Sequence, residues 1–267
     1  MGRSRYKIRP IIAALLVYAL FIGGIAAGAK VGFLHISPAA GEELPAPRIL
    51  LAADPAPKEQ PGDKPLAVVY CTHTSEEYAG QKRAGGVAGG VFSAAKALAA
   101  GLEGQGIGCI LLDTVFDAPD WNKAYGNSLA ALEKVKKEHP EIELFVDVHR
   151  DSPVAGLDTH YHDDSGDYAR MMLIIGSDAN LEHPNWQKNK TFAYALQDKI
   201  NAARPGLMRD ARIYSGRYNQ HMGNKAILVE IGSNENTVDE ACASAEVLAR
   251  ALAELLAQDQ ANILPDR

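Results

Sequence analysis

Residues 66–73, LAVVYCTH, hold the stretch that decides the fold: an unbroken apolar run that ends in a histidine. Apolar and polar residues do not alternate in this run, so we expect both of its faces to be buried. Continuous apolar runs of this length are typical of parallel strands that helices cover on both sides. Similar runs follow along the chain as IGCILLD (107–113), EIELFVDVH (141–149) and AILVEIG (226–232).

Helical patterns separate these predicted strands. Apolar residues at helical spacing predict helices over 86–104, 121–139 and 185–203. Thr237 and Glu240 form a capping box, which predicts the start of a last helix. Residues 157–176 predict an antiparallel hairpin with Gly166 in its turn. The expected fold is therefore α/β, with a mixed, mostly parallel sheet and helices on both of its faces.

Three of the apolar runs end in a residue that can do chemistry, namely His73, His149 and Glu230. Sites in open α/β sheets form outside the carboxyl ends of the strands, so these side chains would converge if the strands are parallel neighbours. Glu76 follows His73 by three residues and adds a carboxylate. Two imidazoles and one carboxylate suit a catalytic zinc, which keeps a fourth position open. The alternative, that these are ordinary strand-end residues and a paired carboxylate, stays open on spacing alone.

Other polar residues have less specific patterns. Arg150, beside His149, could hold a substrate carboxylate or stabilise an oxyanion, or it could form a solvated salt bridge. Glu230 would be left as a carboxylate near the metal, able to accept the proton of a water. His160 and His162 are assigned to the surface of the predicted hairpin. Cysteines 71 and 109 lie on predicted strands and could be neighbours, and free thiols are expected for both.

The N-terminal segment is a topology signal. Residues 1–10 carry four cations and no acid, and residues 11–29 carry no charge at all. A helix of that length spans about 28 Å, which matches the hydrocarbon core of a bilayer. We therefore expect a cytoplasmic N-terminus and a single transmembrane anchor at 11–29, with a cleaved signal peptide as the alternative.

The remainder of the chain divides into a linker, a domain and a tail. Residues 30–65 form a linker rich in proline, the pattern predicts one domain over 66–257, and 258–267 form a C-terminal tail. The net charge of the chain is −6, and no block of lysine and arginine occurs, so the sequence indicates no nucleic-acid partner.

Several motifs together resemble the stage II sporulation protein P family. They are Thr72-His-Thr-Ser-Glu-Glu-Tyr78, Asp147-Val-His-Arg-Asp151, Asn185-Trp186, Arg217-Tyr-Asn-Gln220, Leu228-Val-Glu-Ile-Gly232 and Asn236-Thr237. The resemblance spans about residues 66–257. It implies a membrane-anchored zinc hydrolase of the cell wall, similar to N-acetylmuramoyl-L-alanine amidases, with an extracytoplasmic catalytic domain. Members with both activities cut the stem peptide from the glycan and also cleave peptide crosslinks.

The resemblance also implies roles for single residues. His73, Glu76 and His149 match the Zn²⁺ ligands of the family and Glu230 its catalytic glutamate. Cys71 stands where many members have a histidine. Because Cys71 and His73 are two residues apart, they would lie on the same face of a strand. We expect that position not to be a ligand, because the other three residues complete the set.

The implied substrate is peptidoglycan, in septal wall thinning and engulfment during sporulation. The implied partners are a lytic transglycosylase, the stage II sporulation protein D, and other membrane engulfment proteins. The alternatives are a zinc carboxypeptidase or endopeptidase that acts on wall peptides, and a wall-binding scaffold without catalysis.

Overall fold

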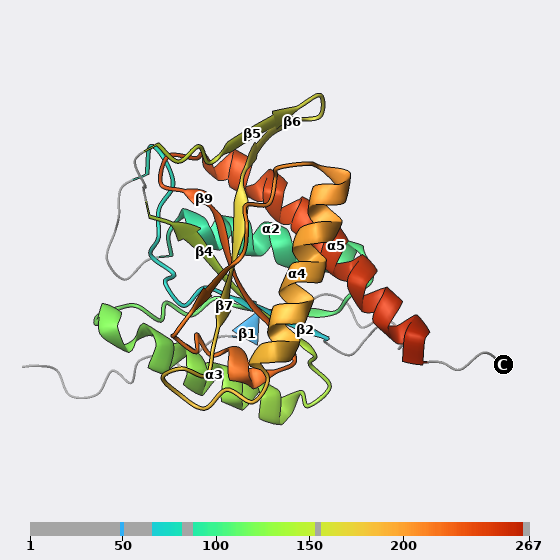
Figure 1. Ribbon diagram of the computed structural model, residues 1–267. Helices are drawn as coiled ribbons and strands as arrows, with labels where there is room; N and C mark the ends of the chain where they lie inside the picture. The colour runs from blue at the N-terminus through green and yellow to red at the C-terminus, as the bar shows by residue number, and fades with distance from the viewer. Residues whose placement is uncertain (1–48, 51–65, 82–87, 153–155, 264–267) are drawn as a thin grey trace, which may run out of the picture. The chain divides into compact units, whose positions relative to one another are not determined.

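The computed structural model describes residues 49–50, 66–81, 88–152 and 156–263 (Figure 1). Contacts along the backbone divide the chain into two units, Met1–Leu44 and Pro45–Arg267, and the described residues all belong to the second. The expected anchor at 11–29 and nearly all of the expected linker therefore lie outside the described residues. Within the described part, no helix has both the length and the apolar character needed to cross a membrane.

The core of the fold is a seven-stranded sheet whose order is β1-β3-β2-β4-β9-β7-β8. Its strands are β1 (Ile49–Leu50), β2 (Ala67–Tyr70), β3 (Cys109–Leu112), β4 (Leu144–Asp151), β7 (Met171–Gly176), β8 (Arg212–Tyr214) and β9 (Lys225–Ser233). The four central strands β3, β2, β4 and β9 are parallel to one another. β7 runs antiparallel to β9, and β8 runs parallel to β7. The predicted mixed, mostly parallel sheet is confirmed.

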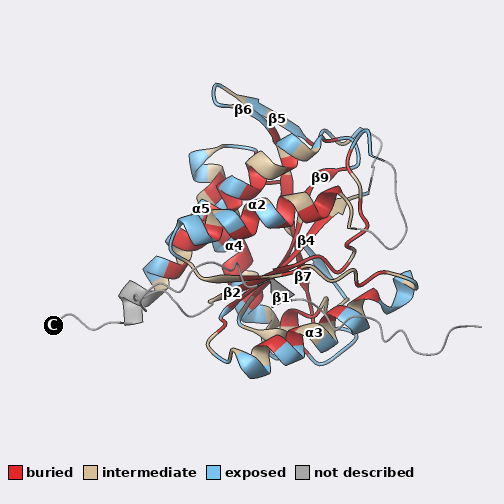
Figure 2. Ribbon diagram, turned by 180° about the vertical axis from the view of Figure 1, so that it is seen from behind, coloured by how far each residue is buried: buried red, intermediate tan, exposed pale blue. Residues whose placement is uncertain are grey.

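Helices cover the two faces of this sheet unequally. One apolar core joins α2 (Gly90–Gly104), α4 (Trp186–Ala203) and α5 (Val238–Ile263) to strand residues such as Val69 and Val146. A smaller core joins α3 (Ala124–Glu138) to the neighbouring residues Val68 and Phe145. Successive strand residues point to opposite faces, which explains why the runs are apolar throughout. Figure 2 shows the strands buried and the helices exposed along their outer sides.

The pattern between 157 and 176 forms two different structures. β5 (His160–Asp163) and β6 (Gly166–Ala169) make the antiparallel hairpin, as predicted. Residues 171–176 do not belong to it, because they form β7 and pair with β9 in the main sheet. The edge strand β8 had no signal in the sequence, since all three of its residues are exposed and it has no apolar run.

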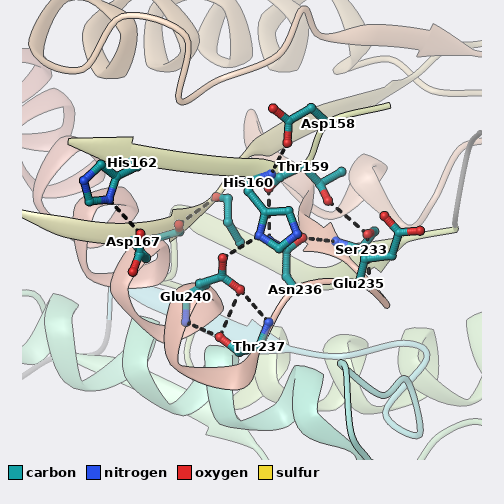
Figure 3. Close-up of polar contacts among 12 residues, drawn as sticks. Asp158, Thr159, His160, His162, Asp167, Ser233, Glu235, Asn236, Thr237 and Glu240 are labelled. Atoms are coloured by element: carbon teal, nitrogen blue, oxygen red, sulfur yellow. Dashed lines mark hydrogen bonds and ion pairs between the residues drawn. The ribbon is translucent and has the colours of Figure 1, made fainter. Parts of the chain in front are cut away.

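The hairpin of β5 and β6 contacts the start of α5 through polar side chains (Figure 3). The Nδ1 atom of His160 lies 2.6 Å from Glu240 Oε1, and this contact raises the pKa of His160. Glu240 also accepts a hydrogen bond from the backbone N–H of Thr237, at 2.6 Å, and donates its own N–H to Thr237 Oγ1, at 3.2 Å. The predicted capping box is thus confirmed. His160 and His162 both lie on the exposed hairpin, as expected, where His162 contacts Asp167.

Cys71 and Cys109 are free thiols, as expected, but they are not neighbours. Cys109 pairs with Ala67 at the beginning of β2, whereas Cys71 follows the last residue of that strand. The two thiols therefore lie near opposite ends of β2 and are not neighbours, and both are free.

Candidate active site

Polar side chains gather where β2, β4 and β9 reach their carboxyl ends. His149 on β4 lies directly opposite Glu230 on β9, and β2 pairs with the other edge of β4. A turn after β2, closed by a hydrogen bond from the N–H of Glu76 to the carbonyl of His73, brings those two residues to the same place. These residues line one cleft of about 350 Å³ together with Arg150. The convergence predicted from the strand ends is therefore observed.

His149 is held between two carboxylates. Its Nε2 atom lies 3.0 Å from Asp147 Oδ1, and its Nδ1 atom lies 3.6 Å from Glu76 Oε2. Asp147 is itself fixed by the backbone N–H of Thr72 at 2.8 Å and the Thr72 hydroxyl at 2.6 Å. Burial lowers the pKa of His149, but the two carboxylates outweigh burial and raise it well above its usual value.

Glu76 is almost completely buried in the floor of this arrangement, with 9 % of its surface exposed. Its Oε2 atom accepts a hydrogen bond of 3.0 Å from the backbone N–H of Arg150. Burial raises the pKa of Glu76, but the contacts with His149 and Arg150 prevail and lower it, so the side chain is a carboxylate at neutral pH. Glu77 has a different position, because its carbonyl accepts a hydrogen bond from Arg150 Nε and its side chain does not line the cleft.

His73 is placed by aromatic rings. It stacks on Trp121 with the ring centroids 3.7 Å apart and an interplanar angle of 9°. The rings of Tyr125 and His149 lie edge-on to it, at centroid distances of 5.5 and 5.3 Å. Burial, with a contribution from His149, lowers the pKa of His73 to about 4, so its imidazole is neutral at pH 7. No motif in the sequence had pointed to Trp121 or Tyr125.

Glu230 faces the cleft from β9. Its Oε2 atom is buried and has no hydrogen-bond partner among the described residues. Burial raises the pKa of Glu230 to about 7; the charge of His149 lowers it, and the charges of Glu76 and Asp151 raise it. A carboxylate whose pKa lies near neutrality can both accept and return a proton, which is what a general base in hydrolysis must do.

The guanidinium of Arg150 donates hydrogen bonds to backbone carbonyls. Its Nε donates to the carbonyl of Glu77 at 3.0 Å, and its Nη1 donates to that of Asp151 at 3.4 Å. Neither bond neutralises the charge of Arg150, so a cation remains at the wall of the cleft. Arg150 forms no salt bridge within the described part of the chain, where Asp151 pairs with Arg209 instead. The alternative of a solvated salt bridge for Arg150 is therefore not found there.

Cys71 points away from this cleft, contrary to the face assigned to it from strand alternation. It is buried in the core under α2, with 1 % of its surface exposed. β2 ends at Tyr70, so the two-residue alternation does not extend to His73, which lies in the following turn. The thiol therefore does not line the cleft with the histidines.

The donor atoms of the site fit a zinc ion in chemical type. The 3.6 Å between His149 Nδ1 and Glu76 Oε2 exceeds a normal hydrogen bond, and ligands of one tetrahedral zinc are about 3.3 Å apart. The other ring nitrogen of His149 faces a carboxylate, as in many metal-bound histidines. The Nδ1 atom of His73 is buried and has no hydrogen-bond partner in the part of the chain that the structure describes. Among the described residues, however, no three such side chains are grouped closely enough to form a metal site as they stand.

The fold and the cleft define an open α/β protein with two histidines and two glutamates at the carboxyl edge of its parallel strands. The model of the family "Stage II sporulation protein P (SpoIIP)" matches residues 40–253, so the chain belongs to that family. It is 25% identical over 225 residues to Stage II sporulation protein P of Bacillus subtilis (strain 168), covering 74% of this chain and 53% of the relative. The chain thus spans about half the length of that curated relative.

Solved structures of similar architecture include three amidases. The CwlD amidase from Clostridioides difficile, solved in complex with the GerS lipoprotein, matches with a TM-score of 0.47 and 11% identity over 71% of this chain and 98% of that one. An N-acetylmuramoyl-L-alanine amidase from Clostridium difficile 630 has a TM-score of 0.46 and 14% identity, and the match covers 73% of this chain and 97% of that one. The N-acetylmuramoyl-L-alanine amidase AmiC2 of Nostoc punctiforme has a TM-score of 0.44 and 18% identity, and the match covers 72% of this chain and 97% of that one.

Proposed function

We propose that this protein is a zinc-dependent peptidoglycan hydrolase that cleaves the amide between N-acetylmuramic acid and the L-alanine of the stem peptide. Its proposed role is the thinning of the septal wall and engulfment during sporulation. One observation carries the proposal: the Glu230 carboxylate, with a pKa of about 7, faces the same cleft as the donor atoms of His73, Glu76 and His149. Membership of the SpoIIP family supports it.

His73, Glu76 and His149 would hold the zinc, which supplies Lewis-acid polarisation of the scissile carbonyl. Asp147 keeps His149 in place, because its two oxygens are already fixed by Thr72. The backbone N–H of Arg150 fixes the Glu76 carboxylate.

Glu230 takes the proton from the attacking water and passes it to the leaving amine, so one carboxylate acts first as a base and then as an acid. The guanidinium of Arg150 lies at the wall of the cleft without a carboxylate partner in the described residues. It is the cation best placed to stabilise the negative charge that develops on the carbonyl oxygen.

The test is digestion of purified peptidoglycan by the full-length, metal-loaded chain in detergent micelles. We expect new N-terminal L-alanine in step with free lactyl carboxyl groups on muramic acid, measured by end-group labelling and mass spectrometry. Treatment with a chelator should abolish both products, and added zinc should restore them. New ends found only inside the peptides would instead assign the site to a carboxypeptidase or endopeptidase. A folded, zinc-loaded protein that releases no ends would favour a wall-binding scaffold.

We also propose that residues 11–29 anchor the chain in the cell membrane with the catalytic domain outside the cytoplasm, within reach of peptidoglycan and of a lytic transglycosylase partner. Protease added to intact protoplasts is expected to degrade residues 66–257, while a cytoplasmic marker protein stays intact. The N-terminus of the mature chain should lie at Met1 or Gly2. An N-terminus near residue 30 would mean a cleaved signal peptide, and a domain protected from protease would contradict the topology.

A further inference from the structure

The cleft does not end at the candidate catalytic residues but continues over β7 toward β8. Its floor there is apolar, formed by Met172, Ile174 and Leu228 on the face that carries Glu230. A second cavity of about 450 Å³ adjoins the first. The two cavities share four lining residues: Leu157, Met172, Arg209 and Arg212. Together they form a groove that leads from Glu230 to the exposed edge of the sheet.

Among the described residues, four arginines and four acids line the whole groove, but the second cavity holds three arginines and one acid. The first cavity is lined by Arg150, Arg209 and Arg212. The second cavity is lined by Arg170, Arg209 and Arg212. Within the residues that the structure describes, the one ion pair that these four arginines form joins Arg209 to Asp151. Asp210, which is exposed, is the acid that lines the second cavity. The groove beyond Glu230 is therefore suited to an anionic ligand.

Arg209 is built into the groove rather than loosely attached. It is 8 % exposed, and its Nη2 donates a hydrogen bond of 2.8 Å to Asp151 Oδ2. Its Nε is buried and has no partner in the described residues. An unpaired donor on a buried cation is costly unless a ligand or water completes it. Arg212 is exposed at the rim of the groove, on β8.

The register of the strands sets how far these arginines lie from Glu230. Glu230 pairs with Met172, and Arg209 bonds to the backbone of the adjacent Met171 on the other edge of β7. Arg212 pairs with Ile174, two residues further along β7. With strands about 4.8 Å apart and about 3.4 Å per residue, the Cα atoms of both arginines lie roughly 10–12 Å from that of Glu230. Arginine side chains can bridge about half of this span.

We propose that Arg209 and Arg212 form a carboxylate-binding subsite for the peptide half of the substrate, so that the enzyme selects stem peptides whose second residue carries a free carboxylate rather than a carboxamide. This inference rests on the proposed function. The α-carboxylate of a γ-linked glutamate lies about 6 Å from the scissile nitrogen, which matches the reach of the arginines. Guanidinium groups bind carboxylates through paired, charge-assisted hydrogen bonds, and a carboxamide cannot accept them equally well.

The test uses two muramoyl tripeptides that differ only at the second residue, γ-linked D-glutamate in one and D-isoglutamine in the other. Wild-type protein is expected to cleave the carboxylate substrate with at least a tenfold higher kcat/KM, mainly through KM. Arg212→Ala is expected to remove most of that preference by lowering activity on the carboxylate substrate alone. Arg250→Ala is the matched control, because Arg250 is exposed on α5 outside the groove. Arg209→Lys keeps the charge but lacks Nε, and it should weaken the preference in a folded protein.

Calorimetric binding of the two product peptides separates this inference from the proposed function. The subsite is supported if wild type binds the carboxylate peptide more tightly and if this difference is lost in Arg212→Ala but kept in Arg250→Ala. This holds even if neither tripeptide is cleaved. That absence of cleavage would count against the amidase activity. Equal binding of the two peptides, or equal cleavage of the two substrates by wild type, would overturn the subsite while leaving the amidase activity in place.

Discussion

Glu230→Gln is expected to lower the hydrolysis of muramoyl-L-alanine amides by about 10²–10⁴-fold, the range in which general acid–base groups contribute. Glutamine keeps the shape of the side chain and one acceptor oxygen, but it cannot take up a proton from water. We propose Glu230 for that step, because its Oε2 has no hydrogen-bond partner among the described residues and its pKa is raised to about 7. The measurement is kcat on a soluble muramoyl peptide with equal zinc content in both proteins.

Folding must be unchanged for this result to be informative. Glu230 lies on β9 between buried residues, so circular dichroism and thermal unfolding should accompany the kinetics. Glu235→Gln, a change of the same kind at an exposed position in the turn after β9, is the matched control and should keep full activity. Turnover near that of wild type in zinc-loaded Glu230→Gln would show that another group takes the proton.

Glu76→Ala is expected to leave the protein nearly free of zinc and inactive, whereas Glu77→Ala should retain most of the metal and the activity. The two positions are adjacent in the sequence, but only Glu76 lines the cleft, 3.6 Å from His149. Changes to residues behind metal ligands already cost about 10–100-fold in affinity, so the loss of a ligand should cost at least that much. His149→Ala should behave like Glu76→Ala, since it removes a second donor.

The measurement is zinc content after dialysis against a weak chelator, together with zinc affinity from a competition titration. Glu76→Gln provides a second variant of unchanged volume, in case the alanine variant is poorly folded. Loss of zinc in Glu77→Ala with retention in Glu76→Ala would move the ligand to the neighbouring residue. Full zinc content in Glu76→Ala and in His149→Ala would show that the metal is held elsewhere.

The sequence by itself determined the fold class, the central strands and the place where the candidate site residues meet. The strands at 66–73, 141–149 and 226–232 were predictable because their apolar runs are local, and the capping box at Thr237 is a pattern of four residues. Parallel strands present their carboxyl ends on one edge, so His73, His149 and Glu230 could be expected to converge before any neighbour was known. The family motifs supported the choice of Glu76.

Tertiary structure alone decided what surrounds those residues. β7 pairs with β9 instead of joining the hairpin, and β8 extends the sheet to give the arginine groove. Both features depend on pairing between segments that are distant in the sequence. The stacking of Trp121 on His73 and the bonds from Thr72 to Asp147 also join residues far apart in the chain. Such contacts have no local pattern, because they arise when separate elements are packed together and each buried polar group must find a partner. The pKa of Glu230 follows from that same packing, since burial raises it.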